Sequence, residues 1–314
     1  VYRIDFQLGW QADPEEEKKP EKVIPRIRAM LGADREFELE WVSVYTFQCR
    51  RMQQFRHGRV LFVGDAAHQV SPFGARGANS GIQDSDNLCW KLGLVLDGKA
   101  PDSLLDSYSE ERVFAADENI MNSTRSTDFI TPKSRTSLNF RNAVLTLARD
   151  HAFARTLVNS GRLSVPSFLT GSRLNTPDDD AFAGDMVPGA PMDDAPMQED
   201  GTEFWLLDRV GNRFMALVHV EDPAAVDANL AREFKSLAGE PIPLEVVLVS
   251  AKPGRAPEGL RVFEDGRGRF AERYDSTPGT VYLIRPDQHV TARWRAFDAG
   301  RVKAALARAT CNSH

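Results

Sequence analysis

Two short motifs between Arg59 and Trp90 place side chains and backbone groups where they could hold an electron-rich ligand. In the first, four apolar residues, Val60 to Val63, precede Gly64 and Asp65. Such a run predicts a short strand buried on both faces, and the glycine lets the chain turn sharply at its end. An Asp at the carboxyl end of a parallel strand lies where open α/β sheets bind ligands. We therefore expect Asp65 to accept a hydrogen bond from a ligand hydroxyl.

The second motif is a glycine-rich turn, Pro72-Phe73-Gly74-Ala75-Arg76-Gly77-Ala78-Asn79, which fits Pro-x-Gly-x-x-Gly-x-Asn. Helical periodicity follows the turn and predicts one helix face made of Ile82, Ser85, Cys89, Leu92 and Leu96. Glycines allow the backbone to approach a ligand closely, and the amino end of a helix offers unpaired N–H groups. The spacing therefore predicts a binding site for an electron-rich group at the start of the helix.

Gly64-Asp65-Ala66-Ala67-His68, the turn and the helix that reaches Leu92 together resemble the second FAD-binding segment of the single-component flavoprotein aromatic hydroxylases. That family includes phenol hydroxylase, para-hydroxybenzoate hydroxylase and the 3-(3-hydroxyphenyl)propionate hydroxylases. The resemblance implies that Gly64 and Asp65 hold the ribityl chain of FAD. It also implies that the turn residues line the isoalloxazine ring, and these are Pro72, Gly74, Gly77, Ala78 and Asn79. Pro72 would flank the reacting edge of the flavin and is the one catalytic candidate.

Two alternatives remain open for this segment. It could be an ordinary strand, turn and helix crossover in which the glycines serve packing alone. His68 fits the motif, and for it a packing role is favoured over catalysis because no acid or base partner is visible in the sequence.

The activity implied by the resemblance is FAD-dependent hydroxylation of a phenol. NADH or NADPH would reduce the flavin, O2 would add at its C4a atom, and the hydroperoxide would hydroxylate the ring beside an existing hydroxyl. Arg50 and Arg51 form a closely placed basic pair that could bind a carboxylate. The first guess for the substrate is thus a 3-(3-hydroxyphenyl)propionate-like acid, with a neutral alkyl or halogenated phenol as the alternative. A different class of function is a non-catalytic fragment or relative that acts as an assembly or dimerisation module.

Composition limits the other classes of function. The 314 residues are 42% hydrophobic, enough for two domains with a sizeable core, and the formal net charge is -6. No basic stripe is present, which argues against a nucleic-acid partner. No apolar run approaches the roughly 18 to 20 residues of a membrane span, so a cytoplasmic enzyme is expected. The cysteines, Cys49, Cys89 and Cys311, lack metal-site or Cys-x-x-Cys spacing and are interpreted as free thiols, with no metal expected.

The fold class expected is α/β and α+β. No Gly-x-Gly-x-x-Gly occurs, so we expect the remnant of a glutathione-reductase-like FAD-binding domain, with its first FAD-binding segment absent or supplied as a separate piece. Residues 1–57 would end the substrate-binding sheet, because strand-like alternation spans Tyr2 to Leu8 and Phe37 to Phe47 around a helix that Gly32 ends. Tyr45, Gln48 and Arg50 on the second strand are the substrate candidates. A core face is the favoured alternative for that strand.

Residues 58–174 would complete the FAD-binding domain. The stretch from Ser103 to Arg112 resembles a family helix in which Glu111 and Arg112 would anchor it to that domain, and the helices of residues 138–158 imply a homodimer. Residues 175–202 are acidic and rich in Pro and Gly, which predicts an exposed linker. Residues 203–314 alternate strands and helices and resemble the thioredoxin-like domain of phenol hydroxylase relatives. Without redox cysteines, packing or association is its expected role.

Overall fold

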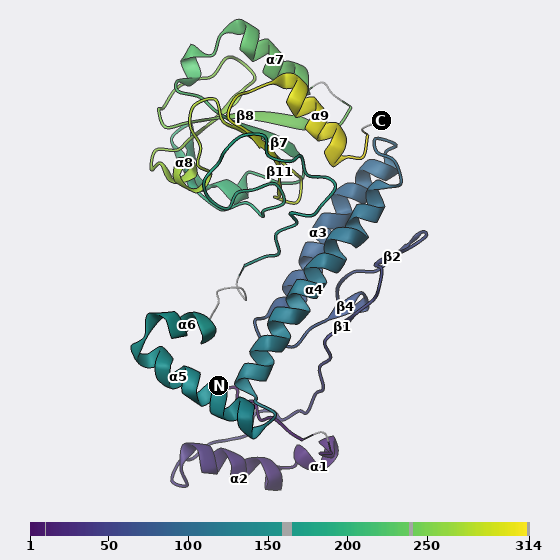
Figure 1. Cartoon of the computed structure of the whole chain (residues 1–314), viewed down its shortest axis with the longest axis vertical. Helices are drawn as coiled ribbons and strands as arrows, with labels where there is room; N and C mark the ends of the chain where they lie inside the picture. The colour runs from purple at the N-terminus through teal and green to yellow at the C-terminus, as the bar shows by residue number, and fades with distance from the viewer. Residues whose placement is uncertain (10, 159–164, 239–240, 313–314) are drawn as a thin grey trace.

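The structure, a computed structural model, describes residues 1–9, 11–158, 165–238 and 241–312. Figure 1 shows two long helices that run side by side through the middle of the molecule. The amino-terminal segments and two further helices lie near one end of this pair, and a separate α/β domain lies near the other. None of the described helices is both long and apolar enough to cross a membrane.

The amino-terminal region contains two helices, α1 (Pro14–Glu17) and α2 (Pro20–Leu31). The side chain of Asp13 caps α1 by accepting a hydrogen bond from the Glu15 N–H at 2.9 Å. Gly32 ends α2 with a φ of 98°, as the sequence predicts, because glycine adopts this conformation without steric cost. The charge and prolines of residues 13–22 are typical of a loop, but α1 and the start of α2 lie within this stretch.

The predicted strands of the substrate sheet do not form among the described residues. Neither residues 2–8 nor residues 37–47 pair with another segment, and the Trp41 side chain is 80% exposed. The alternation is present in the sequence, but a strand needs a neighbour to accept and donate its backbone hydrogen bonds. The described part of the chain places no such neighbour beside them. Tyr45 is exposed, so the favoured interpretation of its strand as a core face is wrong. Its role as a substrate candidate stays a prediction.

Two short antiparallel pairs lead into the motif region. β1 (Arg50–Arg51) pairs with β4 (His68–Gln69), and β2 (Arg56–His57) pairs with β3 (Val60–Leu61). The prediction of a buried parallel strand over residues 60–63 is wrong. Only two of its residues form a strand, that strand is half of a hairpin, and Val60 is 55% exposed.

The long helix pair consists of α3 (Arg76–Leu96) and α4 (Leu104–Ile130). The predicted apolar face of α3 is not its buried face, because Ile82, Ser85, Cys89 and Leu96 are exposed. The face packed against α4 is instead polar; its buried residues are Arg76, Ser80, Asp84, Asn87, Leu88 and Lys91. Charged groups can be buried here because α4 supplies partners of opposite charge. Periodicity identified the helix but selected the wrong side.

Two further helices, α5 (Arg135–Asp150) and α6 (Ala152–Val158), follow α4. Ser134 and Ser137 form a reciprocal capping box at the start of α5. Phe140, Phe153 and Leu157 are exposed on these helices, so the apolar periodicity predicted for residues 138–158 is only partly used within the chain.

The carboxyl-terminal region contains a seven-stranded sheet in the order β11-β10-β7-β8-β9-β5-β6. The strands are β5 (Pro196–Glu199), β6 (Thr202–Trp205), β7 (Phe214–His219), β8 (Leu244–Ser250), β9 (Arg261–Glu264), β10 (Val281–Ile284) and β11 (Val290–Trp294). β7, β8 and β9 are parallel neighbours, and the other pairs are antiparallel. Leu206 and Leu207 continue an apolar run that favours a strand from Trp205, but they belong to a short 3-10 turn after β6.

Both faces of this sheet are buried, as the continuous apolar run of β7 predicts. Phe214, Ala216 and Val218 face α7 (Ala228–Ala238) and α9 (Ala299–Ala309), while Met215 and Leu217 face α8 (Arg269–Arg273). The sequence pattern predicts a strand over residues 281–284 and helices over residues 224–237 and 298–309. The structure has β10, α7 and α9 at these places.

Part of the expected linker belongs to this core. Met186, Ala190, Met192 and Met197 are buried beneath the α8 side of the sheet. The interpretation of residues 175–202 as an exposed linker is therefore wrong from Met186 onward. The methionines of this stretch are spaced so that all three reach the core, which composition alone does not reveal.

Candidate functional site

The glycine-rich turn ends in a helix start that has no cap of its own. Gly74 has a φ of 84° and Ala75 a φ of 52°, which is uncommon for a residue with a side chain and marks local strain. α3 then begins at Arg76 without a side-chain hydrogen bond to its first turn and without an acidic residue there. The first N–H groups of a helix have no partner within it. This turn can therefore receive an electron-rich ligand.

The predicted ring-binding residues lie around this helix start. Pro72, Gly74, Ala78 and Asn79 are exposed and Gly77 is half-buried. Asn79 donates from its side chain to the carbonyl of Ala75 at 2.8 Å, which stabilises the turn. The structure thus brings the turn residues together at one accessible place, as a flavin ring would require.

Gly64 and Asp65 lie beside the same helix. They begin the 3-10 turn η1 (Gly64–Ala66), in which Gly64 has a φ of 57°. A Cβ added to Gly81 of α3 would lie 3.3 Å from the Gly64 Cα, so the two backbones approach each other more closely than side chains allow. The Asp65 carboxylate is exposed, as a ligand-binding group must be.

Asp65 lines a hollow of about 230 Å³. The other lining residues are Arg50, Arg51, Met52, Ala66, Ala67, His68 and Gln69. The hollow therefore combines the proposed ribityl anchor with one of the three substrate candidates, Arg50. The Arg50 guanidinium donates to the Gln69 side chain at 2.9 Å and remains exposed.

The other substrate candidates are less well placed. Tyr45 contacts Phe47, whose ring lies 6.5 Å from that of Phe73 in the turn, so an aromatic run connects this segment to the turn. Gln48 is exposed and does not line the hollow. Arg51 is held by Asp117 of α4 through two hydrogen bonds of 2.6 and 2.7 Å, which leaves Arg50 as the available cation.

Asp84 is the buried centre of the motif region, and the sequence interpretation missed it. One of its oxygens accepts hydrogen bonds from the Gly64 N–H at 2.9 Å and from His68 Nε2 at 2.7 Å. The other accepts from Arg112 of α4 at 2.6 Å. Burial raises the pKa of Asp84. The hydrogen bond from His68 and the charge of Arg112 together lower it by more, so the pKa lies below its ordinary value.

These contacts give His68 and Arg112 their roles. His68 is buried and its ring stacks on Phe55 with centroids 5.6 Å apart, which supports the packing role favoured for it. Its hydrogen-bond partner is Asp84, which the sequence alone does not identify. Arg112 anchors α4 to α3 as expected. Glu111 does the same through Lys91 and also reaches Arg285 of the carboxyl-terminal domain.

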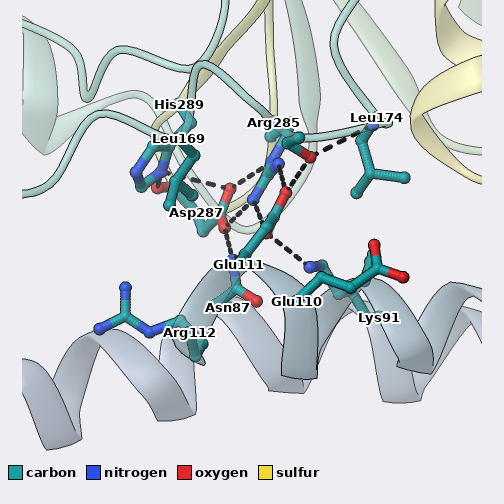
Figure 2. A network of polar contacts seen from close by, with 12 residues as sticks. Asn87, Lys91, Glu110, Glu111, Arg112, Leu169, Leu174, Arg285, Asp287 and His289 are labelled. Carbon is teal, nitrogen blue, oxygen red and sulfur yellow. Dashed lines mark hydrogen bonds and ion pairs between the residues drawn. The ribbon is translucent and has the colours of Figure 1, made fainter. Parts of the chain in front are cut away.

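A second buried network joins the helix pair to the carboxyl-terminal domain (Figure 2). Glu111 accepts hydrogen bonds from Lys91 at 2.7 Å, from Asn87 at 2.8 Å and from both terminal nitrogens of Arg285. Arg285 also contacts Asp287 at 2.6 and 2.9 Å. Burial lowers the pKa of Lys91 to about 8, while the Glu111 charge opposes that shift. The network fixes α3 to the domain at a point along the same helix that begins at the turn.

Comparison with known proteins gives the chemical class. Residues 2–123 match the family described as FAD binding domain. The chain is 30% identical, over 92% of its length and 53% of the relative's, to a 3-(3-hydroxy-phenyl)propionate/3-hydroxycinnamic acid hydroxylase of Paraburkholderia xenovorans (strain LB400). It is 49% identical, over 35% of its length and 21% of the relative's, to a probable NADH-specific resorcinol 4-hydroxylase of Rhodococcus jostii (strain RHA1).

The fold is shared with a solved structure. The flavin-dependent monooxygenase PieE in complex with FAD and substrate superposes with a TM-score of 0.74 at 24% identity, covering 98% of this chain and 57% of that one. These sequence matches confirm the resemblance seen in the motifs: the chain is similar to aromatic hydroxylases, and residues 2–123 match an FAD binding domain. It spans about half the length of the first-mentioned hydroxylase.

Proposed function

We propose that this chain forms the ribityl-side and ring-side part of the flavin site in an FAD-dependent, NAD(P)H-consuming monooxygenase that hydroxylates a phenolic substrate. The observation that carries the proposal is the uncapped start of α3 beside Gly64 and Asp65, within the residues that match the FAD binding domain. Bound FAD supplies the activation of O2 and the transfer of oxygen. The chain supplies the positions of the groups around it.

The residues around the flavin have different tasks. Asp65 accepts a hydrogen bond from a ribityl hydroxyl, and its exposed carboxylate fits that task. The N–H groups of Gly77, Ala78 and Asn79 stabilise negative charge at the pyrimidine end of the ring, because the positive end of the helix dipole points there. Pro72 flanks the reacting edge. Gly64 and Gly74 allow the two turns to bend, as their positive φ values require.

Asp65→Ala tests the cofactor site. Loss of a charged acceptor is worth about 1.5–3 kcal/mol, so FAD affinity should fall by roughly tenfold or more. Flavin absorbance after dialysis measures how much FAD the protein retains. Asp97→Ala is the matched control, because Asp97 is an exposed acid on the same segment whose recorded partner is Lys99 at 3.4 Å. Equal flavin retention in both variants would remove Asp65 from the site.

The substrate class proposed is a phenol with a carboxylate tail, such as a 3-(3-hydroxyphenyl)propionate-like acid. It is supported by the name of the Paraburkholderia relative and by Arg50, which lines the hollow of Asp65 and has terminal nitrogens left to bind an anion. NAD(P)H oxidation should rise more with carboxylated than with neutral phenols. Arg50→Gln should raise KM for the former by about tenfold and leave the latter unchanged. Stimulation by neutral phenols alone contradicts the carboxylate assignment.

The carboxyl-terminal domain is proposed to be thioredoxin-like. The strand order β11-β10-β7-β8, with β7 and β8 parallel and joined by α7, supports this. The described cysteine of the domain, Cys311, has no second cysteine near it in sequence, so the proposed task is packing and not disulfide exchange. The domain boundaries proposed are those expected from the sequence, with one change. The last domain begins at about residue 186 instead of residue 203, because Met186 is in its core.

Self-association through α5 and α6 is also proposed. Phe140, Phe153 and Leu157 are exposed there, and large apolar side chains gain from burial against a protein partner. Sedimentation of the protein with Phe140→Ser and Phe153→Ser tests it. A sedimentation coefficient equal to that of the unchanged protein would exclude this surface.

A further inference from the structure

A hollow of about 600 Å³ opens at the seam between the helix pair and the carboxyl-terminal domain. Its lining residues are Ser103, Arg173, Thr176, Asp179, Trp294, Arg301, Ala304, Ala305, Arg308 and Cys311. They come from the start of α4, the segment of residues 173–179, the end of β11 and helix α9. Figure 1 shows α9 near the end of the helix pair. The volume falls within the range of about 300–1,000 Å³ typical of small-molecule sites. None of these residues belongs to the proposed flavin site.

The lining is positively charged. Arg173, Arg301 and Arg308 face the hollow against a single carboxylate, that of Asp179. Within the described residues, the guanidinium of Arg301 makes no hydrogen bond or ion pair. Arg308 uses its Nε to donate to the carbonyl of Arg173 at 3.1 Å, which leaves its two terminal nitrogens available. Arg173 is more engaged, since it donates to the Ser103 carbonyl at 2.6 Å and pairs with Glu110 at 3.3 Å.

Small apolar residues separate the two arginines of α9. Arg301 and Arg308 are seven residues apart, hence two helical turns or about 10 Å along one face. Ala304 and Ala305 lie between them, and the buried indole of Trp294 completes the apolar part of the lining. Thr176 adds a hydroxyl oxygen that is buried and has no hydrogen-bond partner among the described residues. A ligand could therefore place an apolar body over the alanines and a charged group at an arginine.

We propose that this seam hollow binds an arenecarboxylate. A planar carboxylate matches the paired donors of a guanidinium, and the ring removes apolar surface of Ala304, Ala305 and Trp294 from water. Inorganic phosphate shares the charge but has nothing to place against that apolar surface. An aromatic acid bound here contacts the linker segment, α9 and the start of α4 together, and so holds the two parts of the chain against each other.

Isothermal titration calorimetry of the whole chain with benzoate tests the proposal, with inorganic phosphate as the second probe. We expect saturable benzoate binding, and weaker binding of phosphate. Arg301→Gln should weaken benzoate binding by about tenfold without loss of folding, because this guanidinium has no partner to lose. Ala304→Leu should weaken it as well by filling the hollow from an exposed position.

Arg232→Gln is the matched control, because Arg232 is an arginine on α7 whose recorded contact is with Asn229 of the same helix. Its benzoate affinity should equal that of the unchanged protein. Three results would overturn the proposal: no saturable benzoate binding, equal affinity in the Arg301→Gln and Arg232→Gln variants, or phosphate binding as tight as benzoate binding. Folding of each variant is checked by its thermal melting curve.

Discussion

Arg285 and Glu111 form a two-point ion pair across 174 residues of sequence, with nitrogen to oxygen distances of 2.7 and 3.0 Å. Both side chains are fully or almost fully buried. The pair joins α4 to the loop between β10 and β11, and Glu111 in turn contacts Lys91 of α3 at 2.7 Å. The helix that begins at the proposed flavin turn is thereby tied to the carboxyl-terminal domain. This contact fixes the position of that domain relative to the two long helices.

Arg285→Met should destabilise the protein by about 3–5 kcal/mol, because it leaves the carboxylates of Glu111 and Asp287 buried with too little positive charge. Chemical denaturation measures the free energy of unfolding. Arg267→Met is the matched control, since Arg267 pairs with Glu203 at an exposed position, 2.9 Å apart. The control should cost less than about 1 kcal/mol. Equal costs for the two substitutions would show that the buried pair contributes no more than a surface pair.

The same network predicts loss of stability in acid. Burial raises the pKa of Glu111 and Asp287, but the charge of Arg285 outweighs burial, and both pKa values lie below their ordinary values of 4.5 and 3.8. The unfolded state therefore binds protons first as the pH falls below about 4.5. The stabilisation that these two ionised carboxyl groups give to the folded state is complete above that pH and is lost progressively below it.

The free energy of unfolding measured between pH 6 and pH 3 checks this direction. In Glu111→Gln the decrease over that interval should be smaller than in the unchanged protein, because one of the two carboxyls no longer titrates. Glu203→Gln, an exposed acid, should leave the slope unchanged. A slope that is the same in all three proteins contradicts the assignment.

Gly81→Ala should separate α3 from the turn that carries Asp65. The added Cβ would lie 3.3 Å from the Gly64 Cα, a backbone atom that can move only with its turn. We expect a lower melting temperature and weaker flavin retention. Gly93→Ala on the same helix meets nothing within 4 Å and should stabilise the protein by up to about 1 kcal/mol through helix propensity. If the two variants melt alike, the close approach is not a constraint.

Asp84→Asn tests the buried centre of the motif region. The substitution leaves Arg112 buried without its carboxylate and weakens the hydrogen bonds to His68 and the Gly64 N–H. We expect a cost of about 3–5 kcal/mol and a flavin affinity lower than that of the unchanged protein per folded molecule. Asp128→Asn on α4, whose partner Lys133 is exposed, is the control. Normal flavin affinity in folded Asp84→Asn would limit Asp84 to a structural role.

Much of the local structure could be predicted from the sequence. The end of α2 at Gly32, the helix that starts after the Pro72 turn, the strand over residues 281–284 and the last helix all follow from signals within a few residues. The two motifs also predicted a binding turn for an electron-rich ligand, because glycine positions and the Gly-Asp pair are local requirements of such a turn. That the ligand is FAD was implied by the resemblance of these motifs to a family. Such features depend on φ preferences and side-chain periodicity, which the neighbouring residues determine.

Tertiary structure decided which surfaces are buried and which charges meet. The face of α3 packed against α4 is polar, and no periodicity rule selects it, since its burial depends on Arg112 and Glu111 being placed opposite Asp84 and Lys91. The segments 2–8 and 37–47 alternate like strands, yet pairing needs a neighbouring chain that alternation does not supply. Burial of a charge or a backbone group is favourable only when a partner arrives. Those partners come from residues far away in the sequence, so only the folded chain determines them.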